Sequence, residues 1–117
     1  MRRGEVWTVS GGADYAGKPR PSVIVQDDHF SETSSVTICA FTTHPAEAPL
    51  IRLLVEPSDE NGLAAPSRIM VDKITTVPRV RLGYRLGRLS EEDMVRLNRA
   101  MVVFLGVATP LRLHPPA

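Results

Sequence analysis

Short apolar runs, separated by glycine, proline and polar clusters, occupy the first eighty residues of the chain. The run EVWTV at residues 5–9 alternates polar and apolar positions, which is typical of a strand with one buried face. Further short runs, each bounded by turn residues, continue to Pro78. The pattern predicts five or six strands, the clearest at residues 5–9, 22–26, 36–41, 50–55 and 67–74.

The pattern changes to a helical period after Ser90. A serine N-cap followed by three acidic residues stabilises the positive start of a helix. Leu89 and Met94 are spaced for a hydrophobic contact across that cap, and Gly106 is typical of a helix end. The helix is expected to present one apolar stripe, formed by Met94, Leu97, Met101, Phe104 and Leu105.

These elements predict a mainly β protein with a C-terminal helix, in which a compact barrel-like sheet packs against one long amphipathic helix. The length of 117 residues suits one domain, which we place at residues 1–108. Residues 109–117 contain three prolines and are expected to form an unpacked tail. A small sheet has exposed edges, so a dimer that covers one of them is expected.

The composition indicates in which cellular compartment the protein is expected. Hydrophobic residues make up 43% of the chain and charged residues 23%, as in ordinary soluble proteins. The single cysteine, Cys39, lies in an apolar run, which argues against a disulfide scaffold and a cysteine zinc site. No apolar segment follows the Met-Arg-Arg start, and the longest apolar stretch, 101–108, is too short to cross a bilayer. We therefore expect a cytoplasmic protein with no membrane association.

The net charge of +1 excludes little, but the cations are unevenly placed. They gather in the predicted loops and short strands, at Lys18, Arg20, Arg68, Lys73, Arg79, Arg81, Arg85 and Arg88. A nearly neutral chain can still present one basic face, although charges dispersed over a solvated surface would give the same list.

Several common catalytic motifs are absent from the sequence, including GK[ST] phosphate loops, HExxH, GxSxG and CxxC. His29, His44 and His114 are far apart and have no partner at a metal-binding spacing. The sequence therefore predicts neither a metal site nor a cofactor.

Polar residues at strand ends are the remaining candidates for chemistry. Arg20 lies between two prolines, which restrict the backbone beneath it. A guanidinium held in this way presents paired donors that match two phosphate oxygens. If the sheet brings the strand ends together, they form a pocket suited to phosphodiester chemistry, with Arg20, Thr42, Thr43, Arg68, Asp72 and Lys73. Alternatively, Pro-Arg-Pro simply begins a strand, and Arg20 forms a surface ion pair.

Three stretches of the chain, in order and spacing, resemble the MazF/PemK/Kid family of toxin endoribonucleases. They are RGEVW at 3–7, RPSVIVQDD at 20–28 and AFTT at 40–43, while VDKI at 71–74 and the closing helix fit the family less closely. The resemblance implies a small SH3-like barrel of five to seven short strands with a C-terminal helix. It also implies a homodimer that cuts single-stranded RNA without a metal, by attack of the RNA 2′-hydroxyl on the adjacent phosphate.

The resemblance also assigns roles to residues. It makes Arg20 and Thr42 the catalytic pair, and it implies a cognate antitoxin whose acidic segment covers the RNA groove. Many relatives carry polar residues where this chain has Tyr15-Ala16, and some carry an arginine in place of Met70, so the family's groups for proton transfer are not all present here. His44 and Asp72 are our candidates for that role, because the expected fold places them close to the site. The expected RNA-binding residues are Tyr15, Lys18, Thr43, Arg68 and Lys73. The Tyr15 ring can stack on an unpaired base, although a loop residue that covers the core would fit the same position.

Two alternative functions remain open on the same fold. Gyrase poisons of the CcdB type bind a topoisomerase through a bulky aromatic C-terminus, whereas this chain ends in LHPPA and has its one tryptophan at position 7. Non-catalytic SH3-like modules hold proline-rich peptides in an aromatic groove, but aromatic residues form only 5% of this chain and are scattered.

Overall fold

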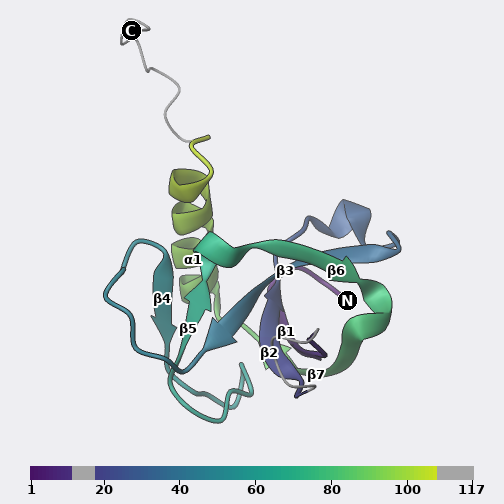
Figure 1. The fold of residues 1–117 in the computed structure, drawn as a ribbon, viewed down its shortest axis with the longest axis horizontal. Helices are drawn as coiled ribbons and strands as arrows, with labels where there is room; N and C mark the ends of the chain where they lie inside the picture. The colour runs from purple at the N-terminus through teal and green to yellow at the C-terminus, as the bar shows by residue number, and fades with distance from the viewer. Residues whose placement is uncertain (12–17, 108–117) are drawn as a thin grey trace, which may run out of the picture.

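The computed structural model describes residues 1–11 and 18–107. These residues form seven strands and a C-terminal helix (Figure 1), which confirms the mainly β fold with one closing helix. The strands are β1 (Glu5–Val9), β2 (Arg20–Ile24), β3 (Ser35–Thr42), β4 (Arg52–Val55), β5 (Ser67–Met70), β6 (Thr75–Pro78) and β7 (Leu82–Arg88). The helix is α1 (Glu91–Phe104), and the 3₁₀ turns are η2 (Asp28–Phe30), η3 (Val71–Lys73) and η4 (Arg79–Arg81).

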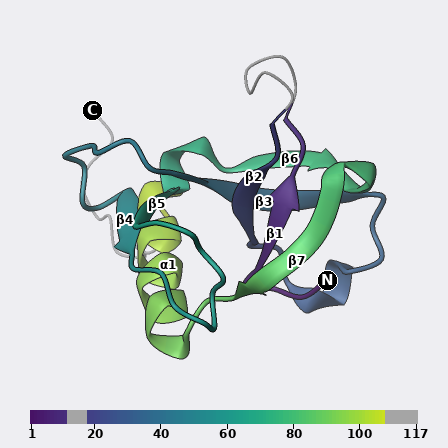
Figure 2. The same ribbon diagram turned by 90° about the horizontal axis from the view of Figure 1, so that it is seen from below.

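All the strand pairs are antiparallel, in the order β4-β5-β3-β2-β1-β7, and β6 pairs with β3. The eight-residue β3 organises the sheet because it serves three partners. Its first half pairs with β6 and its last two residues pair with β5, while β2 lies along its other edge. The sheet curls as β3 passes from one set of partners to the next, and α1 packs beside β4 and β5 (Figure 2).

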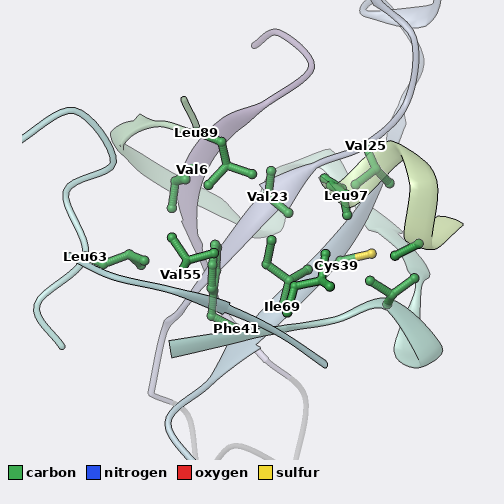
Figure 3. Close-up of a cluster of buried hydrophobic side chains, with 13 residues drawn as sticks. Val6, Val23, Val25, Cys39, Phe41, Val55, Leu63, Ile69, Leu89 and Leu97 are labelled. Atoms are coloured by element: carbon green, nitrogen blue, oxygen red, sulfur yellow. The ribbon is translucent and has the colours of Figure 1, made fainter. Parts of the chain in front are cut away.

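Two apolar clusters fill the fold. The larger one lies between the sheet and α1 (Figure 3) and includes Val23, Cys39, Phe41, Ile69 and Leu97. A smaller cluster lies inside the curl of the sheet and contains Val9, Ile24, Val36 and Ile38. Burial raises the pKa of the Cys39 thiol to about 12, so this cysteine stays protonated and acts as a small apolar side chain.

Both predicted ends of α1 are present. The Ser90 hydroxyl accepts a hydrogen bond from the Asp93 N–H at 3.1 Å, as an N-cap does. At the other end Gly106 has a φ of 72°, and the N–H groups of Gly106 and Val107 donate to the carbonyls of Val103 and Val102. These two bonds close the last turn. They require the positive φ at residue 106, which glycine adopts without steric cost.

The predicted apolar stripe of the helix is right only in its first three turns. Leu97 is fully buried, and Met94 and Met101 pack partly against the core. Phe104 and Leu105 are 42% and 51% exposed, so their assignment to the buried stripe was wrong. The reason is that the last turn of α1 projects beyond the sheet, where no strand covers it (Figure 1).

Two further predictions are corrected. The expected strand at 67–74 ends at Met70, and Asp72 and Lys73 lie on the turn η3. Strand β7 was missed because its sequence LGYRLGR lacks apolar alternation. Its glycines serve close packing instead: a Cβ at Gly87 would lie 2.2 Å from the backbone oxygen of Glu60.

Within residues 1–11 and 18–107, no helix has the length and hydropathy needed to span a membrane.

Candidate active site

The period of two along the strands divides the sheet into two faces. Val23, Cys39 and Phe41 point into the core under α1, and we call their side the helix face. Their neighbours in β2 and β3 point to the opposite side, which we call the distal face. On β2 and β3 the distal face carries Arg20, Ser22, Ile24, Val36, Ile38, Ala40 and Thr42.

The strand register brings the predicted catalytic pair together. Ser22 lies opposite Ala40 in the β2–β3 ladder, and extending that register by two residues places Arg20 opposite Thr42. On the other edge of β3, Thr42 lies opposite Arg68 of β5. Arg20, Thr42 and Arg68 therefore form a row across three neighbouring strands, which are spaced about 4.8 Å apart.

Arg20 has a constrained backbone, as predicted, but it is the first residue of β2 and does not precede the strand. It lies opposite Val9 in the β1–β2 ladder, and the next pair joins Pro21 to Thr8. The exposed side chain leaves this constrained position on the distal face. A guanidinium on a stiff backbone retains its orientation when an anion arrives.

Arg20 lines two hollows. The large hollow has a volume of about 320 Å³ and is lined by Arg20, Pro21, Phe41, Thr42, Thr43, Leu63, Ala64, Ala65 and Ser67. The small hollow has a volume of about 60 Å³ and is lined by Val9, Ser10, Gly11, Arg20, Ser22, Ile38, Ala40, Met70, Lys73, Thr75, Val77 and Arg81. None of these described lining residues is a carboxylate, so both hollows favour an anionic ligand.

The hydroxyl of Thr42 has a fixed orientation. Its Oγ1 accepts a hydrogen bond of 3.1 Å from the backbone N–H of His44. The hydroxyl proton is then directed elsewhere and can be donated to a ligand in the large hollow. His44 itself is exposed just after β3, and its side chain does not line either hollow.

Asp72 is occupied by an ion pair. Arg52 of β4 donates to both of its carboxylate oxygens, at 2.7 and 3.0 Å. These hydrogen bonds lower the pKa of Asp72 below its usual range, so the carboxylate stays ionised at neutral pH. Asp72 lines neither hollow beside Arg20, although we expected it to share a pocket with that residue.

The expected RNA-binding residues lie at different places. Thr43 lines the large hollow, and Lys73 lines the small one. Arg68 follows Thr42 in the row and also lines a third hollow, of about 510 Å³, together with Arg52 and Arg96. Lys18 is exposed two residues before β2, and Tyr15 lies outside the described residues.

Sequence reasoning missed one residue of the site, Arg81. It was counted among the cations but given no role, because it is more than fifty residues from Arg20 in the sequence. The turn η4 brings it to the small hollow, where its backbone oxygen accepts a 2.9 Å hydrogen bond from the Ser10 N–H. Only the β1–β7 pairing reveals this proximity.

In the described part of the chain, no three His, Cys, Asp or Glu side chains are grouped in a way that could hold a metal ion. The expectation of a reaction without a metal remains a prediction.

Comparison with known proteins agrees with this geometry. The family of PemK-like, MazF-like toxins of type II toxin–antitoxin systems matches residues 2–105. A probable endoribonuclease MazF of Mycolicibacterium smegmatis is 53% identical over 108 residues, which cover 92% of this chain and 99% of that protein. An endoribonuclease MazF of Staphylococcus saprophyticus is 32% identical over 119 aligned residues, which cover 97% and 98% of the two chains.

The solved structures place the fold in the same group. An endoribonuclease from a mycobacterial species, solved in complex with its cognate antitoxin, superposes with a TM-score of 0.78 at 26% identity. The superposition covers 94% of this chain and 99% of that one.

Proposed function

The chain belongs to the family of PemK-like, MazF-like toxins of type II toxin–antitoxin systems, and we propose how it acts as an endoribonuclease. It cuts single-stranded RNA at short sequences and thereby inhibits translation and growth. The observation that carries this proposal is the row on the distal face, where Arg20 lies opposite Thr42 and lines two hollows whose described linings have no carboxylate.

The scissile phosphate binds between Arg20 and Thr42. The RNA 2′-oxygen forms a bond to phosphorus while the bond from phosphorus to the 5′-oxygen breaks. The products are a 2′,3′-cyclic phosphate and a 5′-hydroxyl, so one proton leaves the 2′-oxygen and one arrives at the 5′-oxygen. The Arg20 guanidinium neutralises the charge that develops on the phosphoryl oxygens, and the Thr42 hydroxyl donates to one of them.

His44 is the candidate for proton transfer that lies beside the row. Its backbone N–H donates to the Thr42 Oγ1, and its imidazole carries two ring nitrogens, one of which can accept a proton while the other donates one. Asp72 acts differently from our expectation. Because Arg52 holds its carboxylate as an anion, Asp72 positions Arg52 and η3 and does not transfer a proton.

The RNA backbone follows the cations of the distal face. From Arg20 the RNA continues past Thr43 toward Arg68. Lys18 and Lys73 contact the phosphates on either side of the cut. We also retain Tyr15 as a residue that stacks on an unpaired base. DNA is not cut because it lacks the 2′-hydroxyl that attacks the phosphate.

Two protein partners complete the proposal. A relative of this chain was solved with its cognate antitoxin, and we propose that an antitoxin with an acidic segment covers the basic distal face here. We further propose that the toxin acts in the cytoplasm as a homodimer, in which a second copy covers an exposed edge of the sheet.

The test is incubation of the purified protein with a long single-stranded RNA in excess EDTA, followed by mapping of the product ends. The wild type should give discrete cuts with 5′-hydroxyl ends. Arg20→Ala should give none, and Arg99→Ala should cut like the wild type, because Arg99 is exposed on α1 away from the site. Intact RNA from all three proteins, or 5′-phosphate ends, would overturn the proposal.

A further inference from the structure

The small hollow beside Arg20 differs from the large one in its lining, which combines an apolar floor with several cations. Its floor is apolar and is formed by side chains of the distal face, namely Val9, Ile38, Ala40, Met70 and Val77. Three cationic residues line it as well, Arg20, Lys73 and Arg81. A ligand that fills this hollow needs apolar faces together with polar edges that accept hydrogen bonds.

Lys73 and Arg81, two of the cations that line the small hollow, differ from four arginines elsewhere in the described chain. Arg2, Arg52, Arg85 and Arg96 each pair with a carboxylate. Within the described part of the chain, neither Lys73 nor Arg81 has such a partner. Their donors remain available to a ligand.

The volume limits the size of the ligand. A cavity needs about 10–15 Å³ of this measure for each water, and each water represents about 30 Å³ of liquid. The small hollow, at about 60 Å³, therefore matches four to six waters, or roughly 120–180 Å³ of ligand. That range admits one nucleobase, and the chemistry of the lining must select which one.

We propose that the small hollow is a base pocket for uracil in the nucleotide next to the scissile phosphate, with Arg81 as the residue that determines specificity. This inference rests on the proposed function, because Arg20 lines both hollows and a phosphate held there places its nucleoside within reach. Uracil has two carbonyl oxygens that accept hydrogen bonds from cations. Cytosine, adenine and guanine each carry an exocyclic amino group, which donates and is disfavoured beside Lys73 and Arg81, whereas uracil is the RNA base without one.

Arg81 is better placed than Lys73 to read the base. Arg81 is half-buried and its backbone is anchored to Ser10, whereas Lys73 is exposed at the rim. A guanidinium also has donors in a fixed planar fork, and an ammonium group does not. Arg81 should therefore account for most of the base preference, and Lys73 for general attraction to phosphate.

The experiment measures binding and cleavage separately. Four short RNAs differ only in the base beside the cut site found with wild-type protein, and each is also made with a 2′-deoxy sugar at the cut so that it binds uncut. The variants are Arg81→Met, the charge-preserving Arg81→Lys, and Arg88→Met as the matched control. Arg88 ends β7, about 20 Å along the strand from Arg81, and does not line the hollow.

The wild type and Arg88→Met should prefer uracil by about tenfold or more in both assays. Arg81→Met should lose most of that preference, and Arg81→Lys should keep the fold and an intermediate preference. RNA that is cut with unchanged uracil preference by Arg81→Met would overturn the inference alone, as would a wild type that prefers another base. A uracil preference in binding that Arg81→Met loses, together with cleavage of the all-ribose RNAs by Arg20→Ala at the wild-type rate, would support the pocket and overturn the proposed cleavage.

Discussion

The two faces of the sheet are built from the same strands but have different roles: the helix face packs the main core, and the distal face presents the proposed catalytic residues. On the helix face, Val23, Cys39 and Phe41 are at most 2% exposed, and they pack with Leu97 of the helix into the main core. On the distal face, the residues between them in β2 and β3 include Arg20, which lines two hollows. The middle of the distal face, at Ile24, Val36 and Ile38, is buried in the smaller cluster, and only its strand ends at Arg20 and Thr42 are open to a ligand.

This division has a practical consequence for mutagenesis. A substitution at the exposed or half-buried strand ends of the distal face, Arg20 and Thr42, should change RNA cleavage with little change in the free energy of unfolding, and a substitution of a buried residue on the helix face should do the reverse. The following predictions test that separation in order of decreasing expected effect.

Arg20→Lys should have the largest effect. The variant keeps the positive charge but loses the paired donors, so we expect cleavage to fall about 10²–10³-fold, as when a transition-state donor is removed. The free energy of unfolding should stay within about 0.5 kcal/mol of wild type, because the side chain is exposed. Single-turnover cleavage and urea denaturation measure the two quantities, and a lysine variant with wild-type cleavage would show that charge alone suffices.

Leu97→Ala tests the helix face. Leu97 is fully buried under the sheet, and its truncation should lower the free energy of unfolding by about 2–5 kcal/mol. Cleavage per folded molecule should not change. Asn98→Ala, exposed on the same turn of α1, is the control and should be nearly neutral in both assays. A large loss of specific activity in folded Leu97→Ala would mean that the two faces are coupled.

Thr42→Val should reduce cleavage by about tenfold or more, since it removes a hydroxyl that we place on the phosphate while preserving the side-chain shape. Thr43→Val should have a smaller effect, although Thr43 lines the same hollow. Both variants should remain as stable as wild type within about 1 kcal/mol. The opposite ranking in single-turnover assays would assign the catalytic hydroxyl to Thr43.

The Arg52–Asp72 pair should give the smallest effect, on stability and its pH dependence. Asp72→Asn should cost about 1–2 kcal/mol at neutral pH, because it leaves a half-buried guanidinium without its anion. The folded pKa of Asp72 lies below its ordinary value of 3.8, so the stabilisation is present above that value and is lost as the pH falls through the folded pKa. Urea denaturation should show the difference from wild type shrinking between about pH 5 and pH 3. A constant difference over that range would contradict the assignment.

The sequence by itself determined the elements whose signals are local. The Ser90 cap and the Gly106 stop fix α1 through hydrogen bonds within a few residues, and alternation in EVWTV is enough to predict β1. The Pro-Arg-Pro segment and the family resemblance likewise indicated Arg20 and Thr42 without any knowledge of the register.

Only the tertiary structure decided which of these residues meet. Strand register joins side chains from distant segments, and no local signal states that Thr42 lies opposite Arg68, that Arg52 holds Asp72, or that η4 brings Arg81 beside Arg20. Strand β7 could not be predicted for the same reason. Its glycines are required by close contacts with other strands and loops, and its sequence has no alternation of apolar and polar residues. Local chemistry determines elements, whereas sites form where packing brings elements together.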